Sequence, residues 1–131
     1  MVINRRLVAV VDDDESVRES LPELLRLSGF DTHTFRSAEA FIESDSFGQT
    51  SCLILDVGLP GLSGPELHQE LVRQGHRIPT IFITAQSDRS LEARLIARGA
   101  KACLFKPFGD TALLEALTVA LGANDDVDAK G

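Results

Sequence analysis

Residues 7–15 read LVAVV followed by DDDE. The first part of this stretch is apolar at every position and does not alternate with polar residues. Strands that are apolar on both faces belong to parallel sheets that helices cover on each side. Acidic residues at the carboxyl end of such a strand lie where open α/β sheets bind ligands. This stretch therefore predicts a buried parallel strand with a candidate site at its end.

The same alternation of strand and helix patterns continues along the chain. Apolar runs at residues 52–55, 80–83 and 101–105 predict further strands, and the more polar residues 31–36 predict an edge strand. Amphipathic spacing predicts helices at about residues 15–28, 38–43, 64–74, 88–98 and 110–121. Glycines are expected to end four of them, at Gly29, Gly75, Gly99 and Gly122. Strand and helix alternate five times, which is typical of a doubly wound α/β domain.

Length, charge and cysteine use limit the classes of function. The 131 residues correspond to one domain, and the net charge of −7 disfavours direct nucleic-acid binding. No apolar run approaches the roughly 20 residues of a membrane span, and the N-terminus lacks the organisation of a signal peptide. Cys52 and Cys103 lie inside apolar segments, as buried cysteines of a reducing cytoplasm do. We expect a cytoplasmic domain at residues 1–122, without nucleic-acid or membrane contact, and a flexible acidic tail or linker start at 123–131.

Polar side chains follow four of the predicted strands. Asp12 and Asp13 follow the first, and the others end in Asp56, Thr84 and Lys106. Because the carboxyl ends of parallel strands share one edge of the sheet, we expect these groups to lie together. Two carboxylates about 4 Å apart repel by about 4 kcal/mol at an effective dielectric of about 20. Either one of the three is protonated or a cation is bound, and oxygen ligands with open positions suit Mg²⁺.

This set of groups suits phosphoryl chemistry. A carboxylate can act as a nucleophile and form an aspartyl phosphate. Mg²⁺, an ammonium and a hydroxyl can neutralise the phosphoryl oxygens, and the glycine-containing loop at Val57–Gly64 lets the backbone approach. Each residue alone has an ordinary explanation as a helix cap or turn residue, so the hypothesis depends on their joint position at strand ends. Three histidines are interpreted as solvated surface groups: His33, His68 and His76.

Four sequence blocks resemble the receiver domain of two-component response regulators. They are VDDDE at residues 11–15, LD at 55–56 with LP at 59–60 and a glycine at 64, ITA at 83–85, and KPF at 106–108. The resemblance covers about residues 6–122, and the segment SAEAF at 37–41 is most similar to receivers of the FixJ type. It implies a flavodoxin-like (βα)5 fold with a five-stranded parallel sheet in the order 2-1-3-4-5.

The resemblance also implies a role for each candidate residue. Asp56 would be the phosphoacceptor, and Thr84 and Lys106 would contact the phosphoryl group. Mg²⁺ would be held by Asp13, Asp56 and the backbone carbonyl of Gly58, with Asp12 acting through water. The bond between Lys106 and Pro107 would be cis.

In the family that the sequence resembles, the phosphoryl donor is a sensor histidine kinase or a phosphotransfer protein. The chain would be a signalling domain and not an enzyme with its own substrate, because it catalyses only its own phosphorylation and dephosphorylation. Phosphorylation would change the surface formed by residues 88–98, 101–105 and 110–121. That surface would control an output domain or partner, including a phosphorylation-dependent homodimer.

Two positions depart from the family pattern. Cys103 stands where receivers commonly carry an aromatic residue or histidine that acts as a rotameric switch, so an aromatic swing cannot be the readout here. Gly58 lacks the longer side chain that often lies over the site. The alternative function is a receiver-like interaction module that does not depend on phosphorylation. A phosphatase of the haloacid dehalogenase class is disfavoured, because the residues from Asp56 to Gly58 lack the Asp-x-Asp pattern.

Overall fold

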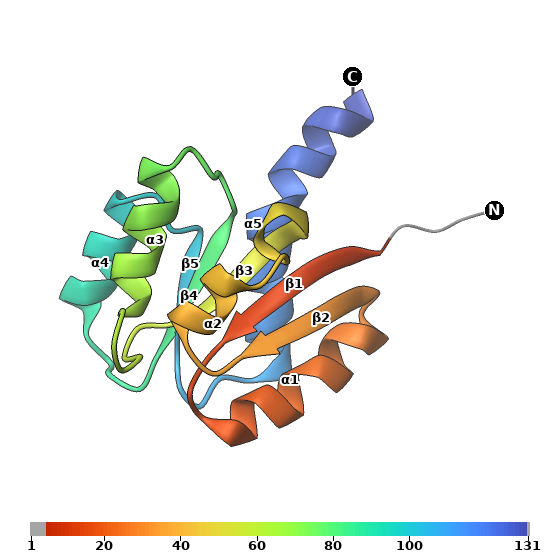
Figure 1. The fold of residues 1–131 in the computed structure, drawn as a ribbon. Helices are drawn as coiled ribbons and strands as arrows, with labels where there is room; N and C mark the ends of the chain where they lie inside the picture. The colour runs from red at the N-terminus through yellow and green to blue at the C-terminus, as the bar shows by residue number, and fades with distance from the viewer. Residues whose placement is uncertain (1–4, 131) are drawn as a thin grey trace.

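A computed structural model describes the backbone of residues 5–130 and the side chains of residues 5–122. The chain forms five strand–helix units (Figure 1). In chain order the elements are β1 (Arg6–Val11), α1 (Glu15–Leu27), β2 (Phe30–Phe35), α2 (Ala38–Glu43), β3 (Thr50–Asp56), α3 (Gly64–Arg73), β4 (Thr80–Thr84), α4 (Arg89–Ala97), β5 (Ala102–Phe105) and α5 (Asp110–Lys130). A short 3-10 helix, η1 (Phe47–Gln49), precedes β3 and has no counterpart in the sequence prediction.

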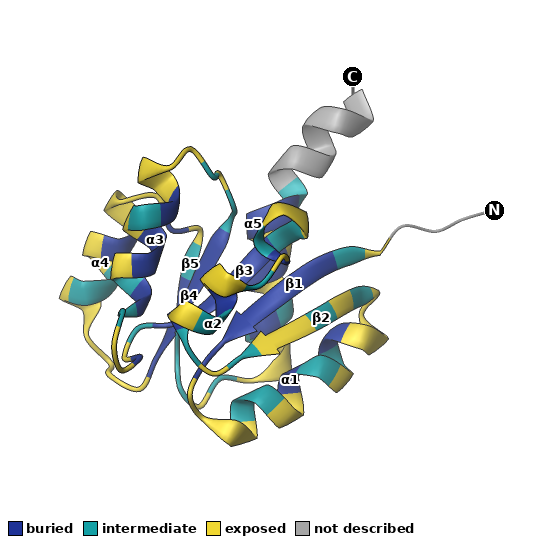
Figure 2. Cartoon of the chain, viewed as in Figure 1, coloured by how far each residue is buried: buried dark blue, intermediate teal, exposed yellow. Residues whose placement is uncertain are grey.

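The strands form one parallel sheet in the order β2-β1-β3-β4-β5, which confirms the predicted fold class. Alternate residues of a strand face opposite sides of the sheet, so β1 contributes to two cores. Val8 and Val10 pack with residues of α1 and α5, whereas Ala9 and Val11 pack with residues of α2, α3 and α4. The central strands are consequently buried between two helical layers (Figure 2). Among the described residues, no helix combines the length and apolar character that crossing a membrane requires.

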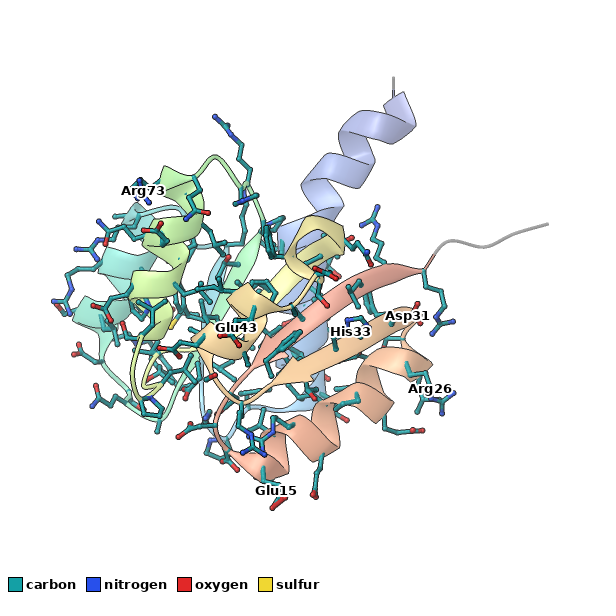
Figure 3. All side chains as sticks on the ribbon, viewed as in Figure 1. Glu15, Arg26, Asp31, His33, Glu43 and Arg73 are labelled. Atoms are coloured by element: carbon teal, nitrogen blue, oxygen red, sulfur yellow. The ribbon has the colours of Figure 1, made fainter. Side chains whose placement is uncertain are left out.

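Side-chain caps and glycines set most helix ends close to the predicted positions. Asp14 caps α1, and its carboxylate accepts a hydrogen bond from the Ser16 N–H at 2.9 Å. Glycines with positive φ follow three helices, as predicted: Gly29, Gly75 and Gly99. Glu15, the first residue of α1, is exposed and points away from the sheet (Figure 3).

The expected end of the last helix at Gly122 is wrong, because α5 continues to Lys130. A glycine inside a helix costs about 1 kcal/mol relative to alanine, which weakens a helix without ending it, and no proline follows it in the sequence. The side chains of residues 123–131, where an acidic tail is expected, lie outside the described part of the chain. Its flexibility stays a prediction.

The histidines are less uniformly exposed than the sequence indicated. His68 on α3 is only 7% exposed, and its ring meets the Phe82 ring edge-on at 5.5 Å. Burial lowers the pKa of this imidazole. The ring of His76 is partly buried against Phe47, whereas His33 is exposed. The interpretation of His68 as a solvated group is therefore wrong. His68 lies on the buried face of α3, together with Leu67 and Leu71.

Candidate functional site

The end of β1 places one carboxylate inside the protein and the next outside. Asp12 is fully buried, and its backbone N–H donates to the carbonyl of Phe35 at 3.0 Å. Its Oδ1 accepts from the Asp14 N–H at 2.9 Å, so the turn into α1 holds the carboxylate in place. Asp13, between these two residues, is exposed.

The end of β3 brings Asp56 to the same position at the edge of the sheet. Asp56 is 6% exposed, and the next N–H, that of Val57, bonds to the carbonyl of Ile83 on β4 at 2.9 Å. Asp12, Asp13 and Asp56 each offer a carboxylate oxygen, and these oxygens lie within 4.8 Å of one another. The structure therefore brings together the three carboxylates that the sequence placed at separate strand ends.

Lys106 supplies the positive charge between the two buried carboxylates. Its Nζ lies 2.9 Å from Asp12 Oδ2 and 3.5 Å from Asp56 Oδ1. Its backbone N–H donates to the carbonyl of Thr84 at 2.7 Å, and the following peptide bond to Pro107 is cis, as expected. The loop after β5 thus points a largely buried ammonium into the acidic cluster.

The remaining two predicted residues border the cluster. Thr84 is 3% exposed at the end of β4, and its hydroxyl accepts a hydrogen bond from the Gln86 N–H at 3.1 Å. Gly58 is exposed, and a side chain there would meet no other atom within 4 Å. Its backbone N–H lowers the pKa of the Asp56 carboxyl. The space beside Gly58 is therefore open toward solvent.

The charges of the cluster oppose one another. Burial raises the pKa of the Asp56 carboxyl to about 6, and the neighbouring Asp12 charge adds to this effect. Lys106 and the Gly58 N–H act in the opposite direction. Burial by itself lowers the pKa of Lys106, but pairing with Asp12 and Asp56 outweighs it, so the net direction is upward. Lys106 therefore stays charged, while Asp56 is held in its ionised form only weakly.

The residues fit a hard divalent cation. Asp12 Oδ2 is completely buried and receives no well-aligned hydrogen bond from the described residues, although Lys106 lies beside it. The cluster offers oxygen atoms alone, from Asp12, Asp13 and Asp56, and oxygen ligands suit Mg²⁺. One ammonium cannot neutralise three carboxylates, so the donor set and its charge both favour a bound cation.

Some contacts of the site have no counterpart in the sequence interpretation. Arg18 on α1 donates from Nη1 to the carbonyl of Asp12 at 2.9 Å. Glu39 on α2 accepts a hydrogen bond from the Leu62 N–H at 2.8 Å, in the loop that follows Asp56. Sequence spacing does not indicate either pair, because each joins residues that only the fold brings together.

Cys103 lies on β5, where it is paired in register with Phe82 of β4. It is 8% exposed, and burial raises the pKa of its thiol to about 11. Cys52 and Cys103 are both free and buried. The thiol is therefore neutral near pH 7 and packs as a small apolar group.

Comparison with known proteins places this site in a family. Residues 8–118 match the model of the response regulator receiver domain. Nodulation protein W of Bradyrhizobium diazoefficiens is 44% identical over 116 residues, and the transcriptional regulatory protein FixJ of Azorhizobium caulinodans is 39% identical over 115. Each alignment covers 88% of this chain but only 51% and 54% of the relative, so the chain spans about half their length.

Solved structures agree with the sequence match. The response regulator StyR has a TM-score of 0.84 at 42% identity, covering 97% of this chain and 64% of that one. The structure named FixJ-N has a TM-score of 0.78 at 34% identity, covering 90% of this chain and 94% of that one. With its acidic cluster at the ends of β1 and β3 and a lysine from β5 beside it, this chain belongs to the response regulator receiver domains of two-component signal transduction.

Proposed function

We propose that the chain accepts a phosphoryl group on Asp56 in a Mg²⁺-dependent reaction and thereby switches a signalling surface. The observation that carries this proposal is the placement of three carboxylates and one ammonium together at the carboxyl ends of β1, β3 and β5. Asp12 is fully buried with Lys106 2.9 Å from its Oδ2, and Asp13 is exposed. Asp56 is 6% exposed, its Oδ1 lies 3.5 Å from Lys106, and the position of Gly58 two residues later is open to solvent. These features support Asp56 as the phosphoacceptor.

In the proposed reaction, a carboxylate oxygen of Asp56 attacks the phosphorus of a phosphohistidine on a sensor kinase or phosphotransfer protein. The oxygen–phosphorus bond forms, the nitrogen–phosphorus bond breaks, and the imidazole leaves with the electron pair of that bond. Lys106 pairs with the negative charge on the phosphoryl oxygens, and the Thr84 hydroxyl donates to another of these oxygens. Water later attacks the phosphorus of the acyl phosphate, which releases inorganic phosphate and restores the Asp56 carboxylate.

The proposed metal ligands are the carboxylates of Asp13 and Asp56 and the backbone carbonyl of Gly58, with Asp12 acting through water. Bound Mg²⁺ would neutralise charge on the reactants and keep Asp56 ionised. The chain's own contribution is position, since the backbone hydrogen bonds of Asp12 and Val57 fix the two buried carboxyl groups. Preformed placement lowers the reorganisation that the reaction requires.

The proposed output surface consists of α4, β5 and α5. Phosphorylation adds about −1.5 to −2 charge at Asp56, which would draw Thr84 and Lys106 toward it and shift the loops after β4 and β5. Cys103 is too small for an aromatic swing, so these loop shifts would be the readout. A homodimer or an output domain beyond this chain is the proposed partner, in a cytoplasmic setting.

Phosphorylation by a small donor tests the proposal. The chain is incubated with acetyl phosphate and Mg²⁺, and its intact mass is measured. Wild type and the control Asp45→Asn, which changes an exposed aspartate outside the site, should gain one phosphoryl group. Asp56→Asn should gain none, and chelation of the metal should abolish the gain in wild type.

Equal phosphorylation of Asp56→Asn would refute the assignment of the phosphoacceptor. Beryllofluoride with Mg²⁺ provides a second test, since it mimics the acyl phosphate. If neither phosphoryl transfer nor a beryllofluoride-dependent spectral change occurs in wild type, the alternative of a phosphorylation-independent interaction module is correct.

A further inference from the structure

A carboxylate on α2 contacts the loop that carries the proposed metal ligand Gly58. Glu39 Oε2 accepts a hydrogen bond from the backbone N–H of Leu62 at 2.8 Å. The two residues are 23 positions apart in the sequence. The contact joins the short helix beside the edge of the sheet to the loop at residues 57–63, between β3 and α3.

The loop is held at several points. At its start the Val57 N–H donates to the carbonyl of Ile83 on β4 at 2.9 Å, and further along Glu39 accepts from the Leu62 N–H. Leu59 is 5% exposed and packs in the core between the sheet and α2, α3 and α4. At its far end, Ser63 and Glu66 form a capping box that begins α3. Between these anchors Gly61 has a φ of +74°, and a Cβ there would lie 2.8 Å from Glu39 Oε2. The carboxylate thus lies directly against a loop backbone whose positive φ favours glycine.

Glu39 is not needed to cap its own helix. Ser37 caps α2 by accepting a hydrogen bond from the Ala40 N–H at 3.0 Å. The residue that would complete a capping box is Ala40, which has no side-chain acceptor. The Leu62 N–H is also the largest cause of the lowered pKa of the Glu39 carboxyl. A charged acceptor makes a stronger hydrogen bond than a neutral one, so Glu39 is suited to hold the loop.

We propose that Glu39 is a positioning residue for the metal site, because it fixes the loop that presents the Gly58 carbonyl to the cation. This inference rests on the proposed function, in which that carbonyl is a ligand. Gly58 is exposed and has no side chain to restrain it. Its position therefore depends on its neighbours in the loop: Val57, which is bonded to β4, and the residues up to Leu62, which Glu39 holds. Groups that orient metal ligands from outside the coordination shell commonly change metal affinity by about 10- to 100-fold.

The test compares Mg²⁺ affinity among variants of the whole chain, measured by calorimetry or by NMR titration. Glu39→Ala removes the acceptor and should weaken Mg²⁺ binding by about three- to tenfold. This effect is at the lower end of the range for groups that orient metal ligands, because Glu39 is exposed. Glu39→Gln keeps an acceptor oxygen but loses the charge that strengthens the bond, so its Mg²⁺ affinity should lie between those of wild type and Glu39→Ala.

Glu43→Ala is the matched control, because Glu43 is an exposed carboxylate at the other end of α2 (Figure 3). It should also bind Mg²⁺ within about twofold of wild type. Hydrogen exchange at the Leu62 amide reports the contact without any metal. Exchange there should accelerate by about tenfold in Glu39→Ala, as expected from losing one hydrogen bond, while the urea midpoint changes little.

The outcomes separate the two proposals. If wild type binds no Mg²⁺, the proposed function fails. If wild type binds Mg²⁺ and Glu39→Ala binds it equally well, only the positioning role is wrong. A loss in Glu39→Gln as large as that in Glu39→Ala would also overturn it, because charge and not the hydrogen bond would then be responsible.

Discussion

At the scale of single residues, the acidic cluster that the proposed reaction uses lowers the stability of the fold. Asp12 and Asp56 are both buried, and Lys106 is the cation placed between them. Burying a charge is costly unless it is fully paired, and repulsion between carboxylates adds to that cost. In the absence of a divalent cation, the clustered carboxylates of the site should therefore destabilise the fold.

Asp56→Asn should stabilise the chain by about 1–3 kcal/mol at pH 7.5 in chelator, since it removes one of the opposing charges. The folded-state pKa of Asp56, about 6, lies above its ordinary value of 3.8, so wild type loses stability as pH rises between these values. The gain in Asp56→Asn should accordingly vanish below that range. Urea unfolding at pH 7.5 and at a pH below 3.8 measures this difference in the free energy of unfolding. Asp45→Asn, which changes an exposed aspartate, is the control. A destabilised Asp56→Asn at pH 7.5 would contradict this account.

Lys106→Met should have the opposite effect in chelator. Removing the ammonium leaves two neighbouring carboxylates without their counterion, at a cost of about 1–3 kcal/mol for a lysine that keeps some contact with water. Saturating Mg²⁺ should reduce the difference in the free energy of unfolding between Lys106→Met and wild type. Lys101→Met changes an exposed lysine just before β5 and should be nearly neutral. Equal urea midpoints for the two variants would show that the ion pairs with Asp12 and Asp56 contribute nothing.

At the scale of elements, the close approach of α3 to β3 sets the end of the site loop. A Cβ on Gly64, the first residue of α3, would lie 2.2 Å from the carbonyl oxygen of Asp56. Gly64→Ala should therefore displace the helix or the strand end and destabilise the chain by about 1–3 kcal/mol. Its phosphorylation should slow as well, because Asp56 moves with its backbone.

Gly48→Ala is the matched control for this substitution. Gly48 lies in η1, and a Cβ there would meet no atom within 4 Å. Urea unfolding and the rate of phosphorylation by acetyl phosphate should be close to wild type in this variant. If Gly64→Ala behaves in the same way, the contact between α3 and β3 is not a constraint on the site.

At the scale of the whole molecule, binding of a cation to the folded state should raise global stability. Once Mg²⁺ exceeds its dissociation constant, each tenfold increase in free metal should add about 1.4 kcal/mol to the free energy of unfolding. Thermal or urea unfolding across a Mg²⁺ series measures this slope. Asp13→Asn should shift the onset to higher metal concentration, whereas Asp45→Asn should not. An unchanged onset in Asp13→Asn would place the cation elsewhere.

The sequence determined the fold class and most of the candidate site because both depend on local patterns. Continuous apolar runs predicted buried parallel strands, and the strand order was implied by the resemblance and then confirmed. The residues at the strand ends were predicted to meet for a topological reason, since parallel strands bring their carboxyl ends to one edge. The helix cap that the acidic run predicted is present as well, at Asp14.

The tertiary structure decided what depends on contacts between distant residues. Only packing shows that His68 is buried against Phe82, that Lys106 lies nearer Asp12 than Asp56, and that Glu39 holds the Leu62 amide. The sequence also did not predict that α5 continues past Gly122, because a glycine weakens a helix without ending it. Hydrophobic periodicity records which face of an element is buried, whereas distances between charges arise only when separate elements pack together.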